Sequence, residues 1–197
     1  MFRKGRPGRA GDRYCVEGVT QRGGSEDRSA TGGSESEDSV TGDLSGFVAA
    51  TFLRGINYVQ LPTTLLAQVD SSIGGKTGVN HQKGKNMVGV FHQPRLVLID
   101  TTSLSTLPRR DFHSGLYEIL KYGLIYDKRF FSLLERILTS LLQQDKKHLD
   151  EVISRCCEIK AEVTSRDERE TGFREILNFG HTFAHGFEAA ANFSKKL

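Results

Sequence analysis

The chain has 197 residues, of which 37% are hydrophobic, and its 27 basic residues nearly balance its 24 acidic ones. This length allows one sizeable core or two small ones, and a net charge of +3 gives no basic surface of the kind that binds nucleic acid. No apolar stretch reaches the ~20 residues that cross a bilayer, and the N-terminus lacks the apolar segment of a secretory signal. We therefore expect a cytoplasmic protein without a membrane or nucleic-acid partner, which suits a small anionic ligand.

Residues 1–39 are rich in glycine, serine, arginine and acidic residues and show almost no apolar periodicity. A segment of this composition cannot bury enough apolar surface to offset the entropy lost on ordering. We predict a disordered, low-complexity tail over residues 1–39.

Residues 40–107 have the alternating pattern of an α/β unit. Apolar residues at helical spacing from Leu44 to Phe52 predict a helix, and residues 58–61 read as a strand. A short helix over 62–69, a polar glycine-rich loop over 70–86 and a buried strand over 96–99 follow. Helical patterns then fill 110–126, 128–143, 145–166 and 173–192, with no convincing strand. Residues 108–197 are therefore predicted to be all helical.

One polar stripe on the last predicted helix is a candidate site. At about 100° per residue, five polar side chains fall within roughly 80° of one another on a largely apolar helix: Glu170, Arg174, Asn178, His181 and His185. Such a stripe either lines a pocket or is a solvated face with two incidental histidines. The i, i+4 histidines could bind zinc, but the motif of zinc peptidases requires glutamate where Thr182 stands.

Two further groups of polar residues are candidates. Glu118 and Lys121 are spaced i, i+3 on a predicted helix, an arrangement that surface ion pairs also adopt. The loop from Asp70 to Asn86 resembles a phosphate loop, yet an acid occupies the place of the first Walker glycine. It presents an acid, two lysines and an amide, which suits a polyhydroxylated, phosphorylated small molecule or an exposed polar turn.

Taken together, these segments closely resemble the 3-dehydroquinate synthase family of sugar-phosphate cyclases. The resemblance rests on residues 42–55, 61–80 and 84–87, on EILKYG at 118–123 and on LNFGHTF at 177–183. It implies a remnant of a Rossmann-like NAD-binding domain over 40–107, followed by an all-helical metal and substrate domain over 108–197. It also implies NAD, Zn²⁺ or Co²⁺ as cofactors and, for full-length members, a homodimer.

The family converts 3-deoxy-arabino-heptulosonate 7-phosphate, a phosphorylated keto acid, to 3-dehydroquinate and phosphate in the shikimate pathway. By resemblance, the metal ligands are Glu118 and His181. The implied catalytic and substrate residues are Asp70, Lys76, Asn86, Lys121, Lys160, Glu170, Arg174, Asn178 and His185. The implied cofactor contacts are Asp43, Thr63, Thr64, Lys76, Lys85 and Thr106. Arg174 and Lys160 are expected to suit a carboxylate, and Lys76, Asn86, Asn178 and His185 the phosphate end.

Three departures from the family pattern matter. Glu37, Asp38 and Ser39 replace a glycine triplet, and two carboxylates there oppose the NAD pyrophosphate. The preceding half of the cofactor domain is replaced by the tail, and the family's third metal ligand, a histidine, falls just past Leu197. We expect a partial chain with an incomplete active site. The alternatives are a related cyclase that acts on another sugar phosphate and a fragment without catalytic activity.

Overall fold

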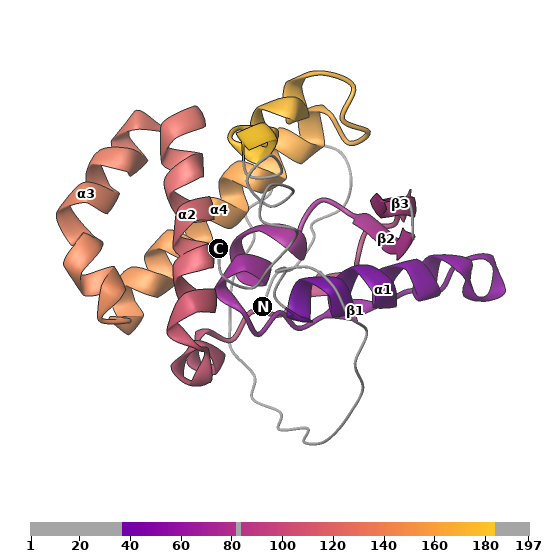
Figure 1. Cartoon of the computed structure of the whole chain (residues 1–197), viewed down its shortest axis with the longest axis horizontal. Helices are drawn as coiled ribbons and strands as arrows, with labels where there is room; N and C mark the ends of the chain where they lie inside the picture. Colours follow the sequence, from indigo (N-terminus) through magenta and orange to yellow (C-terminus); the bar gives the residue numbers. More distant parts are fainter. Residues whose placement is uncertain (1–36, 82–83, 184–197) are drawn as a thin grey trace.

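The computed structural model describes residues 37–81 and 84–183 (Figure 1). In chain order the helices and strands are α1 (Glu37–Thr51), β1 (Val59–Gln60), β2 (Lys76–His81), β3 (Gly84–Phe91), β4 (Leu96–Val97), α2 (Arg109–Ile125), α3 (Lys128–Leu142) and α4 (Lys146–Arg166). Short 3₁₀ or π turns complete them: η1 (Phe52–Arg54), η2 (Ala67–Ser71), η3 (Thr101–Thr106) and η4 (Phe173–Asn178). The described helix α1 includes residues 37–39 of the predicted tail, whereas residues 1–36 lie outside the described part.

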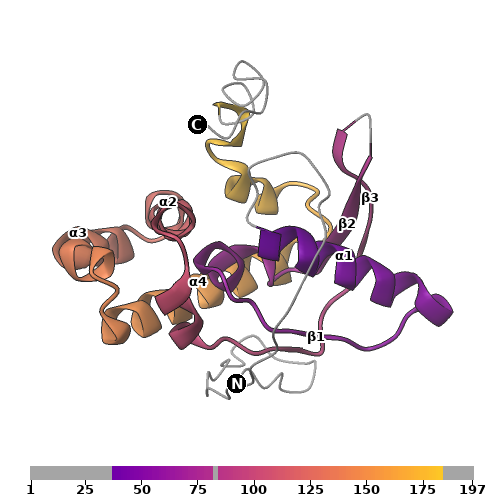
Figure 2. The same cartoon turned by 60° about the horizontal axis from the view of Figure 1, so that its bottom comes forward.

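Strands and helix α1 occupy one side of the molecule, and the helices α2, α3 and α4 occupy the other (Figures 1 and 2). β1 and β4 pair in parallel, with Val59 opposite Leu96. The predicted loop over residues 70–86 is partly wrong, because β2 and β3 form an antiparallel hairpin in which Thr77 lies opposite Val90. Glycines and amides interrupt the alternation of β-branched residues in this segment, so its strand period is hard to recognise.

The helix predicted over residues 62–69 ends in the π turn η2. The buried side chain of Gln68 fixes this turn by donating from Nε2 to the carbonyl oxygens of Pro62, at 3.2 Å, and Asp100, at 3.1 Å. A third bond joins Nε2 to the hydroxyl of Ser103, at 3.2 Å. These bonds hold the turn against η3, and the turn carries Asp70 towards the helical half.

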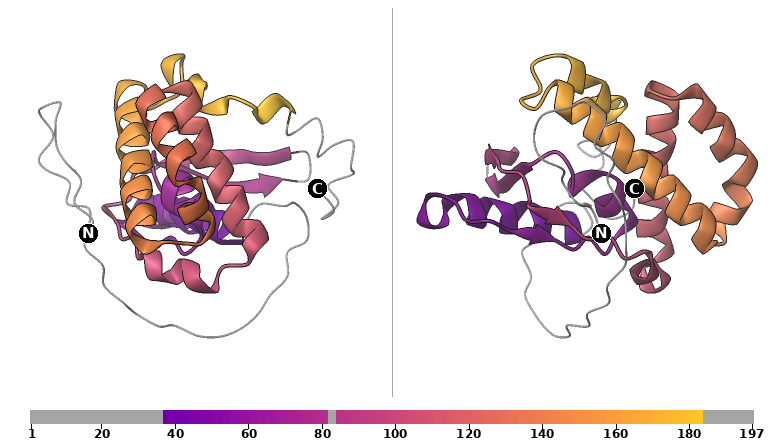
Figure 3. Two further views of the ribbon diagram at one scale, coloured as in Figure 1. Left: turned by 90° about the vertical axis from the view of Figure 1, so that its left-hand side faces the viewer. Right: turned by 180° about the vertical axis from the view of Figure 1, so that it is seen from behind.

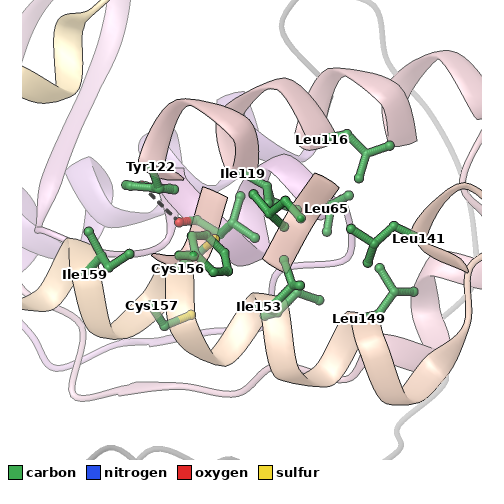
Figure 4. Close-up of a cluster of buried hydrophobic side chains, with 14 of the residues drawn as sticks. Leu65, Leu116, Ile119, Tyr122, Leu141, Leu149, Ile153, Cys156, Cys157 and Ile159 are labelled. Carbon is green, nitrogen blue, oxygen red and sulfur yellow. Dashed lines mark hydrogen bonds between the residues drawn. The ribbon is translucent and has the colours of Figure 1, made fainter. Parts of the chain in front are cut away.

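The three long helices match their predictions within two residues at each end. Between residues 108 and 183 the described structure contains no strand, as predicted. α2 and α3 form a hairpin, and α4 runs back across both towards η2 (Figure 3). Their buried core includes Leu65 from the α/β half as well as Leu116, Ile119, Leu141, Leu149, Ile153, Cys156, Cys157 and Ile159 (Figure 4).

The helix predicted over residues 173–192 is wrong over residues 173–180, whereas residues 181–183 are helical as predicted. Its first turn is the 3₁₀ segment η4, which ends at Asn178, and Gly180 has a φ of +85°. The polar stripe is therefore not one face of a continuous helix. A left-handed glycine within the LNFGHTF motif separates His181 from the turn that carries Arg174. His185 lies outside the described residues. No helix of the described chain is long and apolar enough to cross a membrane.

Gly115 allows α2 to approach the chain just before η2. A β-carbon at this position would lie 2.6 Å from the Leu65 side chain and 2.8 Å from the backbone nitrogen of Leu66. We predict that Gly115→Ala destabilises the protein by on the order of 1–3 kcal/mol, because a backbone atom cannot move aside as a flexible side chain can. Ala is the better helix former by about 1 kcal/mol, so the steric conflict must exceed this gain.

The measurement is the free energy of unfolding from urea denaturation of the wild type and the variant. Ser114→Ala, at the neighbouring exposed position of α2, is the matched control and should leave stability unchanged or slightly raised. A Gly115→Ala variant as stable as this control would show that α2 does not pack this closely.

Candidate active site

Two side chains predicted to bind metal lie together in the structure. The Glu118 Oε1 atom on α2 is 4.0 Å from the His181 Nε2 atom, although 63 positions separate them in sequence. The Glu118 side chain is largely buried, with 19% of its surface exposed, whereas the His181 side chain is 44% exposed. A carboxylate and an imidazole are ligands that zinc accepts. Within residues 37–81 and 84–183 no third His, Cys, Asp or Glu joins them as a metal-binding group.

Lys121 lies one turn after Glu118 on α2 and forms an ion pair with the second carboxylate oxygen, Oε2. Only 7% of the Lys121 side chain is exposed. This i, i+3 ion pair is therefore not an interaction on the solvated surface of the helix. The lysine ammonium instead contacts Glu118, one of the two metal-ligand candidates.

A second ion pair, between Asp70 and Lys160, connects η2 to α4. Lys160 Nζ is 2.5 Å from Asp70 Oδ1 and also donates to the Asp70 carbonyl oxygen at 2.6 Å. The Lys160 side chain is 7% exposed and that of Asp70 is 26% exposed. Burial alone would raise the pKa of Asp70, but the charges of Lys160 and Lys121 outweigh it and hold the pKa well below its ordinary value. Asp70 is thus a carboxylate throughout the neutral range.

Burial lowers the pKa of Lys160, and the charge of Asp70 opposes that shift. Lys160 was predicted to bind a substrate carboxylate. In the structure its ammonium is already bound by the side chain and the backbone of Asp70, so a substrate carboxylate would have to share it.

A third ion pair joins the start of β2 to the segment before η4. Lys76 Nζ contacts Glu170 Oε2, and the Asn178 amide donates to Glu170 Oε1 at 2.7 Å. Burial would raise the pKa of Glu170, yet the bonds from Lys76 and Asn178 lower it. The structure thus brings together three predicted site residues, Lys76, Glu170 and Asn178, which come from different helices, strands and loops. The Lys76 side chain, which is 50% exposed, remains accessible to an anion.

Arg174 has a structural environment that its position in the sequence does not reveal. It is 2% exposed, and its Nη1 atom donates to the carbonyl oxygens of Gly74, at 3.1 Å, and Glu168, at 2.7 Å. Gly74 has a φ of +100°, and a β-carbon there would lie 2.6 Å from Nη2 of Arg174. The arginine therefore locks the loop between Asp70 and Lys76 to the segment that precedes η4.

Asp167 caps the segment that presents Glu170 and Arg174. Its carboxylate accepts hydrogen bonds from the backbone N–H groups of Thr171 and Gly172, at 2.9 Å each, and of Arg174, at 3.0 Å. These bonds lower the pKa of Asp167 from 3.8 to about 2. Glu170 itself has a φ of +58°, so the caps stabilise a backbone turn that non-glycine residues rarely adopt.

The remaining predicted residues are dispersed. Asn86, with a φ of +52°, and Lys85 lie near the closed end of the β2–β3 hairpin, whereas Lys76 lies at its open end. The structure does not bring Asn86 to the ion pairs, because the hairpin separates them by roughly 3.3 Å per residue.

Four predicted cofactor residues sit on the α/β side. The Thr64 hydroxyl accepts from the Ala67 N–H, and the Thr106 hydroxyl and the Thr63 carbonyl both bond to Ser103. Asp43 lies near Tyr58, whose pKa is raised to about 12 by burial and by that charge.

Two small pockets are hollowed elsewhere in the described chain. One, of about 110 Å³, lies between residues 72–74, residues 93–97 and α4. The other, of about 130 Å³, lies between α1 and β1. Neither is lined by Glu118, Lys121 or His181.

Two family models match most of this chain. The 3-dehydroquinate synthase N-terminal model matches residues 31–114, and the C-terminal model of the same enzyme matches residues 115–197. The chain belongs to the 3-dehydroquinate synthase family. It is 58% identical to the 3-dehydroquinate synthase of Nitrosomonas europaea over 158 residues, which are 80% of this chain and 43% of that protein. To the enzyme of Pseudoalteromonas atlantica it is 56% identical over 158 residues, 80% of this chain and 44% of the relative.

Solved structures of related cyclases have the same fold. ValA, a 2-epi-5-epi-valiolone synthase of Streptomyces hygroscopicus subsp. jinggangensis with NAD⁺ and Zn²⁺ bound, matches with a TM-score of 0.73 and 37% identity, over 81% of this chain and 44% of that one. A 2-deoxy-scyllo-inosose synthase complexed with carbaglucose-6-phosphate, NAD⁺ and Co²⁺ matches with a TM-score of 0.65 and 32% identity, over 77% and 41%. The chain thus spans less than half the length of the relatives it matches.

Tyr122, Asp167 and Gly74 also belong to this candidate site, although none of them was predicted from the sequence as a site residue. Tyr122 follows Lys121 in the EILKYG segment, and its hydroxyl is 2.8 Å from Asp70 Oδ1. The available signal was an aromatic residue with a polar group on an otherwise apolar helix face, which needs a partner when buried. For Asp167 the signal was an acid just before a turn containing Thr171 and Gly172.

We predict that Asp167 makes the stability of the chain depend on pH. Because its folded pKa is about 2, below the ordinary value of 3.8, its contribution is complete above pH ~4 and is lost as the pH falls towards 2. Asp167→Asn should be less stable than the wild type at pH 7, and the difference should shrink below pH 4. The measurement is the urea midpoint from pH 7 to pH 2.5. Asp150→Asn, on the exposed face of α4, is the control, and a wild-type-like midpoint for Asp167→Asn at pH 7 would contradict the prediction.

Proposed function

We propose that this chain provides part of the active site of a 3-dehydroquinate synthase, which converts 3-deoxy-arabino-heptulosonate 7-phosphate to 3-dehydroquinate and phosphate. The observation that carries the proposal is the convergence of Glu118 and His181, 4.0 Å apart, next to Lys121. The Asp70–Lys160 pair adjoins them, since the charge of Lys121 acts on Asp70. Family membership and the higher identity to 3-dehydroquinate synthases than to other cyclases support this substrate.

We also propose a divalent metal, Zn²⁺ or Co²⁺, and NAD as cofactors, since related cyclases were solved with them. Glu118 and His181 would hold the metal, which would act as a Lewis acid on substrate hydroxyls. These two side chains suit such a metal, because Oε1 of Glu118 already faces the imidazole of His181. NAD would accept and return a hydride. Residues 40–107 would form part of its binding domain, with Thr63, Thr64 and Thr106 as contacts, and full-length members would form cytoplasmic homodimers.

The side chains suit an anionic, polyhydroxylated substrate. Lys76 is half exposed and could bind phosphate, and Asn178 lies on the same carboxylate partner, Glu170. Asp70, a carboxylate at neutral pH, could accept a hydrogen bond from a substrate hydroxyl. Arg174 is bound to backbone carbonyls, so its expected role in holding a substrate carboxylate is less favoured than a role in fixing the loop.

The second candidate is a related cyclase that acts on a sugar phosphate without a carboxylate. The internal bonds of Lys160 and Arg174 favour it, because both cations predicted to bind the carboxylate already have partners. Against it stands the identity of 56–58% to 3-dehydroquinate synthases compared with 37% and 32% to the two solved cyclases.

We predict that Zn²⁺ binding depends on Glu118 and His181. Glu118→Ala and His181→Ala should each reduce zinc affinity at least tenfold, because each removes one of two ligands. His185→Ala should largely spare it if that histidine contacts substrate. The measurement is a metal-competition titration near pH 7.5, where imidazoles are mostly neutral.

His148→Ala is the matched control for the zinc measurement, since His148 pairs with Asp145 on α4, away from Glu118. It should retain wild-type affinity. Equal losses in the Glu118, His181 and His185 variants would instead make His185 a third ligand. Equal affinities in all variants, His148→Ala included, would contradict the proposed metal site.

We predict that the zinc-loaded chain prefers the phosphorylated keto acid to sedoheptulose 7-phosphate by at least tenfold in Kd. Both compounds carry a phosphate, but sedoheptulose 7-phosphate has no carboxylate and has a hydroxyl at C3, where the keto acid is deoxygenated. Calorimetric titration with each compares a carboxylate-bearing ligand with one that lacks the carboxylate. Inorganic phosphate is the control for phosphate alone. The reverse preference would support the related cyclase, and a lack of affinity for either compound would support a fragment without catalytic activity.

A further inference from the structure

Tyr122 is fully buried at the end of the helical core nearest to Asp70. Its exposed fraction is 0%, and it lies among Cys156 and Ile159 of α4 (Figure 4). The hydroxyl oxygen is 2.8 Å from Asp70 Oδ1 and 3.1 Å from the Val69 carbonyl oxygen. A phenol has one proton to donate. The carboxylate is the stronger acceptor and the closer one, so the hydroxyl donates chiefly to Asp70.

The hydrogen bonds to the Asp70 side chain within the described chain fall on one oxygen. Oδ1 accepts from Tyr122 at 2.8 Å and from Lys160 at 2.5 Å. Oδ2 is left for another donor, and 26% of the Asp70 side chain is exposed. The Asp70 carboxylate is thus held through Oδ1, and Oδ2 can accept a hydrogen bond from a ligand.

Tyr122 and Lys160 differ in how well they can fix a carboxylate. A lysine ammonium ends a flexible four-carbon stem and rotates freely about its last bond. The tyrosine ring has two torsions only, and here the packed core immobilises both. Asp70 lies on a π turn, which is anchored by Gln68 but does not have the regular backbone of an α-helix. A rigid donor is therefore needed to define where Oδ2 points.

We propose that Tyr122 is a positioning residue, whose buried hydroxyl holds Oδ1 of Asp70 so that Oδ2 faces a hydroxyl of the bound substrate. This inference rests on the proposed function for the identity of the ligand. The geometry of Tyr122 and Asp70 does not depend on it. Tyr122 acts through Asp70 and does not itself contact the substrate.

The first test measures Asp70 directly in the full chain without substrate. Carbon NMR of the Asp70 carboxyl should show a higher ionisation midpoint in Tyr122→Phe than in the wild type, by at least half a pKa unit. The variant loses a donor to the charged form, while Lys160, Lys121, Arg174 and Glu118 remain around the pair. An unchanged Asp70 midpoint in a folded Tyr122→Phe variant would overturn the proposal.

Tyr126→Phe is the matched control for loss of a phenol hydroxyl. Tyr126 follows α2, and its hydroxyl bonds to Glu162, not to Asp70. This variant should leave the Asp70 midpoint at the wild-type value. A purely structural role of Tyr122 would lower the unfolding midpoint in urea without moving the ionisation of Asp70.

A second measurement keeps the proposal testable if Tyr122→Phe fails to fold. Replacement of Tyr122 by 3-fluorotyrosine keeps the hydroxyl and nearly the same shape, and its fluorine resonance reports on the phenol. In this background Asp70→Asn should shift the resonance, because the acceptor loses its charge. A resonance unaffected by Asp70→Asn would place the hydroxyl on the Val69 carbonyl and overturn the proposal.

The functional consequence separates this proposal from the proposed function. Tyr122→Phe should weaken binding of the phosphorylated keto acid at least fivefold and leave zinc affinity within twofold of the wild type. Wild-type affinity for the keto acid in a variant with a shifted Asp70 midpoint would overturn the positioning role. A wild-type chain that binds no sugar phosphate at all would instead contradict the proposed function and, with it, the substrate half of this inference.

Discussion

The ion pair between Asp70 and Lys160 is the interaction on which the rest of the site depends. It joins η2 and α4 across 90 positions of the sequence, and Lys160 bonds to both the side chain and the backbone of Asp70. Two charges withdrawn from water cost several kcal/mol each unless they are paired, and removal of one partner from such a pair typically costs about 3–5 kcal/mol. The α/β half and the helical half therefore cannot separate here without exposing or orphaning a charge.

Around this pair the polar groups are arranged as lysine–carboxylate couples. Asp70 pairs with Lys160, Glu118 with Lys121, and Glu170 with Lys76. Two of these ion pairs connect segments that are distant in sequence. The third, between Glu118 and Lys121, lies within α2. A metal bound by Glu118 would therefore compete with Lys121 for that carboxylate, and an anion bound by Lys76 would compete with Glu170.

Two further side chains, Arg174 and Asp167, fix the backbone around the site. Arg174 is buried against the carbonyl oxygen of Gly74, and only a residue without a β-carbon leaves room for its guanidinium. Asp167 satisfies three N–H groups of the turn that leads to Arg174. An arginine inferred to bind a substrate carboxylate thus supports the loop that presents Asp70 and Lys76. Its charge still acts on Lys160, whose pKa it helps to lower.

The sequence by itself determined the family, the three long helices and the pairing of Glu118 with His181 as candidate ligands. The helices were predicted from helical spacing, which is a local property of the chain. The family and the two candidate ligands were inferred from the resemblance of long ordered motifs to those of the 3-dehydroquinate synthase family. Tertiary structure alone decided that residues 76–91 form a hairpin, that the last predicted helix breaks at Gly180, and that Arg174 and Lys160 have internal partners. Pairing between strands and burial of charge depend on contacts between distant segments, so periodicity along the sequence cannot reveal them. The hydroxyl of Tyr122 shows the same limit, since its place beside Asp70 follows from how α2 packs on η2 and not from any residue near it in sequence.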